Sequence, residues 1–495
     1  MDGDVDTDVV VVGAGPVGLL LAAELTQAGA SPVVVERRAS PPGRQRARGV
    51  GPLAAEALAR RGLAGAIAQH HPDGAERKAR DHGSEKDHFA WLHKIDPTRQ
   101  DEPERRGVLI AQPDLEAVLA DHAARLGVVI DRGAAVTALQ DDGSAVTLTI
   151  ESDGAPRRIR ARYVVGCDGG SSTVRKLAGF AFPGTEPIMV GRRATVAVHG
   201  PRPLPPPGRT DRGLLMLAPD TVGTFEFDEL HLPADRRSPV TAEELRDSVR
   251  RTGGVDVVLG EVREALRFTD AAFQASTYRR GRVLLAGDAA HVHSPTGGQG
   301  LNLGLLDAVN LGWKLARQVR GTAPDGLLDT YSAERHPAGA AVLHNTRAQS
   351  ALMRPGPHTD ALRDIVSDLM DIDEVNRYFG RLLSGLDTRY AVADAVPTDH
   401  PLVGKLAPDL ELTTTSGVRR HLSEHTTEGH AVLITPSADR ARSAADGLRV
   451  ISATPTRPDL TEALIRADGA IVWAAGPHHP ADGVRLREAI TTWFG

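Results

Sequence analysis

Residues 8–18 read Asp-Val-Val-Val-Val-Gly-Ala-Gly-Pro-Val-Gly, and this stretch decides the fold of the chain. Its four consecutive valines predict a fully buried parallel strand, and its glycines have the spacing Gly-x-Gly-x-x-Gly. That spacing predicts a tight turn at Gly13, the approach of a pyrophosphate at Gly15 and close helix packing at Gly18. A predicted helix follows and ends at Gly29. We therefore expect the strand, turn and helix of a dinucleotide-binding unit.

A carboxylate stands where such a unit needs one. Residues 33–35 predict a second apolar strand that ends in Glu36, 23 residues beyond Gly13. At this place a carboxylate accepts hydrogen bonds from ribose hydroxyls and disfavours a 2′-phosphate. A glycine pattern alone is a weak signal, but here strand, helix, strand and acid follow in register. FAD or NAD therefore fits this site better than NADP.

A second stretch, residues 282–302, reads Arg-Val-Leu-Leu-Ala-Gly-Asp-Ala-Ala-His-Val-His-Ser-Pro-Thr-Gly-Gly-Gln-Gly-Leu-Asn. It predicts a buried strand, an acidic turn at Asp288, a glycine-rich loop and a helix that begins near Leu301. Asp288 follows the carboxyl end of the strand, where open α/β sheets bind ligands, and its carboxylate suits a polyol hydroxyl. The glycines permit the close approach of a flat ring. Taken alone, this pattern fits an ordinary strand-loop-helix turn as well as it fits a ligand site. Together with residues 8–18 it indicates a flavin site.

A third stretch completes the set. Residues 163–176 read Tyr-Val-Val-Gly-Cys-Asp-Gly-Gly-Ser-Ser-Thr-Val-Arg-Lys and predict a strand, an Asp-Gly turn at Asp168 and a basic helix start. A glycine fingerprint, an Asp-Gly motif and a Gly-Asp motif in this order resemble the para-hydroxybenzoate hydroxylase superfamily of class A flavin monooxygenases. Amine-oxidase-like flavoproteins share only the first motif. The resemblance therefore favours FAD over NAD as the resident cofactor.

Further motifs narrow the resemblance. Residues 307–315, 328–337 and 345–349 are similar to the aromatic polyketide hydroxylases of the tetracycline and angucycline pathways. The resemblance covers nearly the whole chain, and it is specific to this subfamily but not to a substrate. It implies that FAD is bound by Gly13, Gly15, Pro16, Val17, Gly18, Glu36, Arg37, Arg46, Gln112, Asp168, Asp288, Pro295, Gly298, Gly300, Leu301 and Asn302.

Several reactive residue types have plainer interpretations. Cys167 is expected to be a core residue and not a covalent flavin link. His291 and His293 can be proton shuttles, but oriented structural histidines are favoured. We expect a solvated loop without metal-ligand spacing around the histidines of the charged run at 76–106, which are His82, His88 and His93. No catalytic acid or base and no metal ligand can be named.

The expected fold class is α/β, a Rossmann-type FAD-binding domain with an interleaved β-rich substrate domain and a C-terminal thioredoxin-like domain. The boundaries are 1–180 for the first FAD-binding part with a variable substrate cover at 75–106, 181–276 for the substrate domain, 277–353 for the second FAD-binding part, 354–400 for a helical linker region and 401–495 for the thioredoxin-like domain. This last domain has no Cys-x-x-Cys motif, because Cys167 is the only cysteine of the chain. We expect it to have a structural or dimerising role.

Composition narrows the setting. The 495 residues are too many for one core, and a net charge of −6 gives no basic footprint for nucleic acid. No apolar run approaches the ~20 residues of a membrane span, and the first residues do not resemble a signal peptide. A single cysteine fits a reducing cytoplasm. A cytoplasmic monomer or homodimer is expected.

The resemblance also implies a reaction. NAD(P)H would reduce the flavin, O2 would add at C4a, and the hydroperoxide would transfer one oxygen to an electron-rich ring of an aromatic polyketide. NADPH is expected and NADH is possible; with no second fingerprint, either would bind transiently. A Baeyer–Villiger oxygenase or an epoxidase at the same site is an alternative, and a flavin-free binding protein is another. The charged segment 76–106 departs from the family pattern and leaves the substrate and the oxygenated carbon open.

Overall fold

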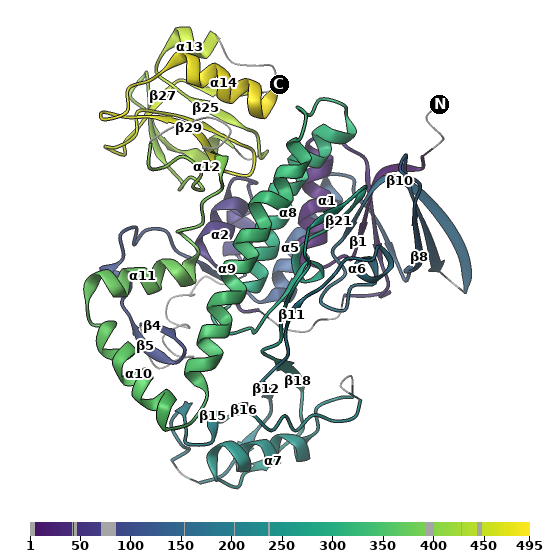
Figure 1. The fold of residues 1–495 in the computed structure, drawn as a ribbon, viewed down its shortest axis with the longest axis vertical. Helices are drawn as coiled ribbons and strands as arrows, with labels where there is room; N and C mark the ends of the chain where they lie inside the picture. Colours follow the sequence, from purple (N-terminus) through teal and green to yellow (C-terminus); the bar gives the residue numbers. More distant parts are fainter. Residues whose placement is uncertain are drawn as a thin grey trace.

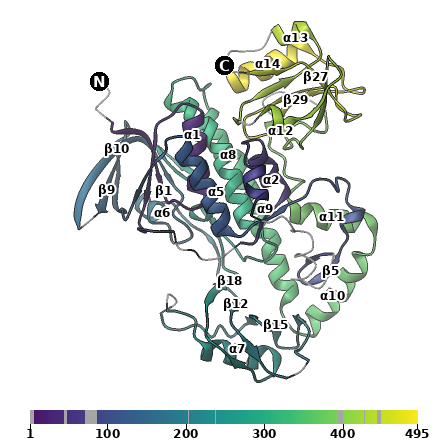
Figure 2. The ribbon, with the colours of Figure 1, turned by 180° about the vertical axis from the view of Figure 1, so that it is seen from behind.

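The computed structural model describes residues 5–41, 43, 47–70, 86–152, 154–201, 203–235, 238–392, 400–426, 428–442 and 448–495. Figures 1 and 2 show three parts from opposite sides: a central layer of strands and helices that contains β1, a sheet below it that contains β12, and a C-terminal part above it. Within the described residues, no helix has the length and apolarity needed to cross a membrane.

The central sheet is built from the stretches quoted above. Its parallel strands have the order β21-β10-β1-β2-β7. Val11 lies between Val165 and Val34, and Val9 to Val11 are fully buried, as a strand covered on both faces requires. This confirms the predicted α/β class. The bounds are β1 Thr7–Val12, β2 Pro32–Glu36, β7 Val129–Arg132, β10 Ala155–Gly166 and β21 Val283–Leu285.

Because these strands are parallel, their carboxyl ends meet at one edge of the sheet. Gly13, Glu36, Cys167 and Asp288 lie at or just beyond that edge. Helix α1 follows β1 and packs between α5 and α8 against one face of the sheet (Figures 1 and 2). The antiparallel hairpin β8–β9 extends the sheet beside β10. The bounds are α1 Pro16–Gln27, α5 Gln112–Arg125, α8 Gly300–Val319, β8 Ala135–Asp141 and β9 Val146–Ser152.

The lower part is an antiparallel sheet in the order β14-β15-β16-β12-β18, with α7 packed against β15 and β16. Thr241 caps α7 by accepting the N–H of Glu244 at 3.1 Å, and Gly254 ends the helix with a φ of 64°. A small sheet, β11-β19-β22, connects this part to the central layer. The bounds are β11 Gly184–Thr185, β12 Met189–Thr195, β14 Gly208–Arg209, β15 Gly213–Ala218, β16 Thr221–Phe227, α7 Ala242–Gly253, β18 Glu264–Thr269, β19 Ala272–Gln274 and β22 His291–Val292.

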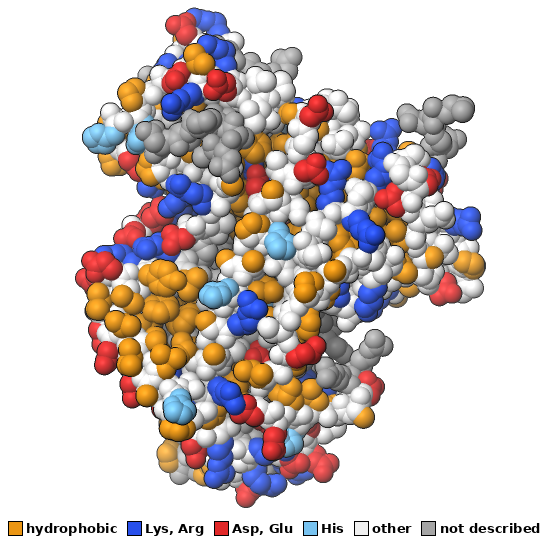
Figure 3. Space-filling view, in the orientation of Figure 1, with side chains coloured by type: hydrophobic (Ala, Val, Ile, Leu, Met, Phe, Trp, Pro, Cys, Tyr) orange, Lys and Arg blue, Asp and Glu red, His pale blue; other side chains and the backbone are white. Residues whose placement is uncertain are grey.

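Helices α9 (Thr330–Met353), α10 (Pro357–Leu369) and α11 (Asp373–Ser384) continue from the central layer along the side of the molecule (Figure 1). Figure 3 shows hydrophobic side chains gathered in this region. Among them are residues of α10, α11 and the turn between them that are 44–59% exposed: Leu362, Ile365, Leu369, Ile372 and Tyr378. These apolar side chains are therefore not covered by the packing of α10 and α11 against the rest of the chain.

The C-terminal part contains a four-stranded sheet in the order β26-β25-β28-β29, with β26 parallel to β25 and β28 and β29 antiparallel to their neighbours. Helix α14 packs against β29. This order is that of a thioredoxin-like sheet, as predicted. The bounds are β25 Val432–Ile434, β26 Arg449–Ile451, β28 Glu462–Ile465, β29 Ile471–Ala475 and α14 Gly483–Phe494.

Buried ion pairs join the C-terminal part to the central layer. The fully buried guanidinium of Arg466 donates to both carboxylate oxygens of Glu334 on α9, at 2.6 and 2.7 Å. Lys314 on α8 donates to the same carboxylate at 2.7 Å, and Asp468 accepts from Arg466 at 2.5 Å. Burial alone would raise the pKa of Glu334, but the charges of Arg466 and Lys314 lower it well below its ordinary value. The C-terminal part and the central layer are therefore held together by one buried network of ion pairs.

We predict that Arg466→Met lowers the free energy of unfolding by ~3–5 kcal/mol, because it leaves the carboxylates of Glu334 and Asp468 buried with less counter-charge. The midpoint of thermal unfolding followed by circular dichroism measures this. Arg485→Met is the matched control, because Arg485 and Asp482 form an exposed pair at 3.6 Å that is worth at most ~1 kcal/mol. Equal midpoints for the two variants would contradict the prediction.

Candidate functional site

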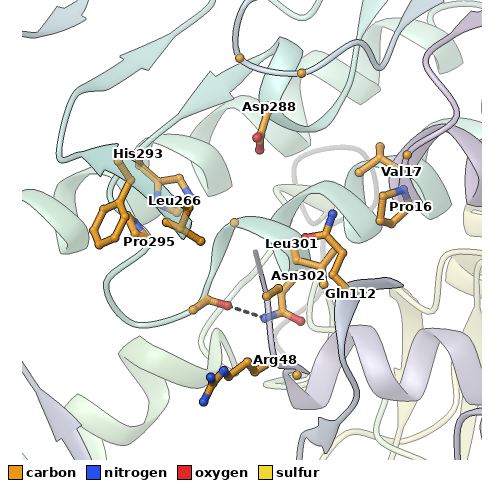
Figure 4. A pocket seen from close by; sticks show the side chains of 18 of the residues that line it. Pro16, Val17, Arg48, Gln112, Leu266, Asp288, His293, Pro295, Leu301 and Asn302 are labelled. Atoms are coloured by element: carbon orange, nitrogen blue, oxygen red, sulfur yellow. Dashed lines mark hydrogen bonds between the residues drawn. The ribbon is translucent and has the colours of Figure 1, made fainter. Parts of the chain in front are cut away.

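A cavity of about 2890 Å³ lies between the carboxyl edge of the central sheet and the lower sheet. All three sequence motifs contribute to its wall, through residues near Gly13, Asp168 and Asp288. Figure 4 shows how side chains from separate elements line this space. The chain therefore brings distant motifs together at one continuous cavity.

The glycine fingerprint forms a closely packed turn. A Cβ at Gly13 would lie 2.5 Å from the carbonyl oxygen of Cys167, and Gly13 has a φ of 112°. A Cβ at Gly18 would lie 1.9 Å from the carbonyl oxygen of Gly13, so that helix α1 meets the turn only through glycine. A Cβ at Gly15 would meet nothing within 4 Å, and no side chain caps the first turn of α1. Among the described residues, the N–H groups of that turn therefore have no side-chain acceptor and can donate at the cavity.

The predicted ribose acid lies beside this turn. One oxygen of Glu36 accepts from the N–H of Ala14 at 3.0 Å, and the other accepts from the N–H of Arg38 at 2.9 Å. Each carboxylate oxygen can accept a further hydrogen bond. Glu36 is partly exposed, and it lines the cavity together with the exposed Arg37.

Asp168 also lines the cavity, but its carboxylate is engaged locally. It accepts from the hydroxyl of Ser172 at 2.5 Å and from the N–H of Thr173 at 2.6 Å, at the start of α6 (Thr173–Leu177). These bonds satisfy donors that the helix start leaves open. Asp168 therefore orders the Asp-Gly turn itself.

Asp288 has the opposite setting. It lies in the one-turn helix η2 (Gly287–Ala289), and its exposed side chain projects into the cavity in Figure 4. The turn is fixed from behind, because the N–H of Gly287 donates to the buried carboxylate of Asp307 at 3.0 Å. His291 donates to the same carboxylate at 2.7 Å and does not line the cavity. His291 thus has the structural place that was favoured for it.

The glycine-rich loop leads into α8, which begins at Gly300. Gly297 and Gly298 have φ values of 82° and 64°, in the left-handed region. No side chain caps the first turn of α8. The amide of Asn302 instead bridges two loops: its oxygen accepts from the N–H of Gly51 at 2.6 Å, and its nitrogen donates to the carbonyl of Gly298 at 2.9 Å, the dashed line in Figure 4. Leu301 lies beside it on the cavity wall.

His293 lies against this loop. Its Nδ1 lies 2.7 Å from the carbonyl oxygen of Ser294, and a Cβ at Gly300 would lie 3.2 Å from its Nε2. Burial lowers the pKa of His293 to about 4, so the ring is neutral at neutral pH. Pro295 and His293 both line the cavity.

The remaining predicted contacts include residues at the starts of helices α1 and α5. Gln112 begins α5 and lines the cavity while it donates to Glu116 at 2.8 Å. Pro16 and Val17 lie on the same wall (Figure 4). Arg46 falls outside the described residues, and the described Arg48 lines the cavity.

The far wall contains residues that the sequence analysis did not identify. Its apolar members on the lower sheet include Met216, Phe225, Leu266 and Phe268. Alternation in short strands predicted a sheet here, but it did not show which strand face the cavity would use. These side chains form an apolar chamber opposite the nucleotide-binding edge.

The expectation of a solvated loop around His88 and His93 was wrong, and His82 falls outside the described residues. The rings of His88, Trp91 and His93 cluster, with centroids 5.4 Å apart for His88–Trp91 and 4.9 Å apart for His88–His93. His88 and Trp91 line the cavity. The signal that was missed is the apolar group Phe-Ala-Trp-Leu at 89–92. Its side chains pack against the interior, although the segment around them is rich in charge.

Family models match most of the chain. Residues 6–346 match the FAD binding domain, and residues 400–495 match the C-terminal domain of aromatic-ring hydroxylases. These two ranges correspond to the central layer with its inserted sheet and to the thioredoxin-like part.

Known proteins resemble the chain over its full length. A 12-dehydrotetracycline 5-monooxygenase/anhydrotetracycline 6-monooxygenase from Streptomyces rimosus is 41% identical, with 99% of each chain covered. The solved structure of CabE, an aromatic hydroxylase from angucycline biosynthesis, has a TM-score of 0.87 at 36% identity over 99% of each chain. A dialkyldecalin synthase from Streptomyces rugosporus is 36% identical over 98% of each chain. The chain therefore belongs to the FAD-binding aromatic-ring hydroxylases and is a flavin monooxygenase.

Proposed function

We propose that this enzyme uses NADPH and O2 to hydroxylate a fused-ring phenolic polyketide of the anhydrotetracycline type. The observation that carries the proposal is the single cavity of about 2890 Å³ that joins the glycine fingerprint to the apolar chamber of the lower sheet. A dinucleotide and a multi-ring substrate can occupy such a space together. The names of the tetracycline and angucycline relatives support this substrate class.

The residues at the sheet edge fit FAD. The open space above Gly15 and the uncapped first turn of α1 suit a pyrophosphate, which helix N-termini attract. Glu36 would accept from the adenosine ribose with the lone pairs that Ala14 and Arg38 leave free. The exposed carboxylate of Asp288 would accept from the ribitol hydroxyls.

The ring end of FAD would lie against the start of α8. When bound, reduced flavin would activate O2, so that one atom of O2 goes to the substrate and the other to water. The uncapped N–H groups of Leu301 and Asn302 would face its negatively charged edge, and the helix dipole adds to their effect. The positive φ values of Gly297 and Gly298 shape the loop that would admit the flat ring. Only one dinucleotide fingerprint is present in the sequence, so NADPH would bind transiently. The enzyme would work in the reducing cytoplasm.

The decisive experiment incubates the FAD-loaded enzyme with anhydrotetracycline, NADPH and isotope-labelled O2. We expect substrate-stimulated NADPH oxidation and a product that has gained one labelled oxygen. The carbon that carries this oxygen separates hydroxylation from Baeyer–Villiger oxidation and epoxidation. A rearranged product of unchanged mass would instead indicate a ring-forming activity such as the one in the name of the dialkyldecalin synthase.

Glu36→Ala is predicted to weaken FAD binding by ~1–3 kcal/mol, because a ribose hydroxyl loses its acceptor in a partly buried site. Titration of the apoprotein with FAD, followed by flavin fluorescence, measures the affinity. Glu36→Gln is the control, because it keeps one oxygen acceptor and should lose less. Unchanged affinity in the alanine variant would show that Glu36 serves only the Ala14 turn.

Asn302→Asp is predicted to keep FAD bound but to lower its reduction potential by about 10–40 mV, the equivalent of ~0.5–2 kcal/mol for a charge at a helix start. A redox titration beside the parent enzyme measures this. Gln318→Glu adds the same charge at the other end of α8, about 24 Å away, and should leave the potential unchanged. A potential that is unchanged or raised in Asn302→Asp would contradict the proposed pose of the flavin.

A further inference from the structure

The hairpin that carries Trp91 has an unusual turn. Strands β4 (Asp87–Phe89) and β5 (Leu92–Ile95) are joined by Ala90 and Trp91, with φ values of 50° and 65°. Both lie in the left-handed region, which two-residue hairpin turns normally fill with Asn and Gly. A bulky residue there is strained, and such strain persists only where the surroundings impose it.

Buried groups from two helices impose this turn. The N–H of the fully buried Ala90 donates to the amide oxygen of Gln349 on α9 at 3.2 Å. The carbonyl of Ala90 accepts from Arg363 on α10 at 2.7 Å, and Arg363 also donates to the carbonyl of Leu352 at 2.8 Å. Arg363 is itself only 8% exposed. The backbone of the turn is therefore clamped on both sides.

The clamp holds the Trp91 ring at the cavity. Trp91 is half-buried and lines the cavity together with His88, which stacks on it at an interplanar angle of 23°. The N–H of Trp91 donates to Nδ1 of His88 at 3.4 Å. His88 thus contacts both the backbone and the indole ring of Trp91. Phe225 and Phe268, which meet edge to face at 5.5 Å, line the same cavity from the lower sheet.

The clamp also reaches the glycine-rich loop. The Gln349 amide donates to Asn345 at 3.3 Å, and Asn345 donates to Gln299 at 2.6 Å, just before α8 begins. A Cβ at Gly297 would lie 3.0 Å from the amide nitrogen of Gln349. One buried chain of amides therefore fixes the distance between the Trp91 turn and the loop that leads into α8.

We propose that Trp91 is the stacking platform that determines specificity for a planar, fused aromatic ring, and that the strained turn exists to hold its indole at that place. This inference rests on the proposed function. A tryptophan that served only as core would not require a left-handed backbone at the cavity wall, where glycine or asparagine is less strained. An indole offers the largest flat face among the side chains, and offset stacking on it favours flat rings over bent ones.

The test compares Trp91→Asn and Trp91→Phe in FAD-loaded enzyme. Asparagine tolerates a positive φ, so this variant keeps the turn and removes the ring. Equilibrium dialysis with anhydrotetracycline and with aklavinone should show affinity about tenfold weaker for Trp91→Asn and within about threefold of the parent for Trp91→Phe. The share of consumed NADPH that yields product should fall with the same order, because a loosely held ring meets the oxygen less often.

Two controls separate the possible failures. Tyr378→Ala removes an exposed aromatic ring of α11 that does not line the cavity, and it should bind both probes as the parent does. FAD content and the midpoint of thermal unfolding should equal those of the parent in Trp91→Asn, because the turn is kept. Parent-like affinity in Trp91→Asn would overturn the inference and leave the proposed function intact. Failure of the parent enzyme to bind either planar probe would overturn both.

Discussion

The cavity depends on one buried carboxylate, Asp307 on α8. Its oxygens accept from the N–H of Gly287 at 3.0 Å and from Arg335 at 2.8 Å, and His291 lies 2.7 Å away. Burial alone would raise the pKa of Asp307, but the charges of Arg335 and His291 lower it below its ordinary value. Because an ionised carboxylate in an apolar interior must keep all these partners, the Asp288 turn, α8 and α9 are held in one arrangement.

The same network explains what the sequence resemblance can and cannot convey. Asp307, Asn310 and Lys314 lie on one face of α8, are fully buried, and bond to Glu334 and Arg335 of α9. These residues belong to the stretches that resemble the polyketide hydroxylases. They hold the parts of the molecule together and do not line the cavity. A resemblance carried by such interior residues indicates the fold of the family. It does not indicate the substrate, because these residues do not contact the cavity.

The nucleotide edge could be predicted from the sequence because local rules decide it. Four valines, the spacing of Gly13, Gly15 and Gly18, and acids directly after strands describe groups that meet wherever parallel strands end together. Asp168 shows the limit of these rules. A carboxylate after a strand can face a ligand or cap the next helix. Asp168 lines the cavity, but it also accepts from the hydroxyl of Ser172 and the N–H of Thr173 at the start of α6.

The hairpin that carries Trp91 could not be predicted in this way. The inward turn at Ala90 and Trp91 depends on Gln349 and Arg363, which lie more than 250 residues away in the sequence. The hairpin lies within the charge-rich segment 76–106, which a pattern rule assigns to solvent. The apolar group at 89–92 hints at burial, but the partners that fix the turn, Gln349 and Arg363, are distant along the chain and cannot be read from the segment itself.

The joining of distant segments has a consequence for synthesis. Strand β21 begins at Val283, long after its sheet partner β10 ends at Gly166, and Glu334 gains Arg466 only near the end of the chain. During synthesis Glu334 therefore has Lys314 as a possible partner from the start, whereas Arg466 becomes available only when translation is almost finished. Contacts this distant in sequence fold slowly. The cavity wall that Gly13 and Asp288 share can consequently form only after both residues have been translated, and we expect flavin to bind late in synthesis.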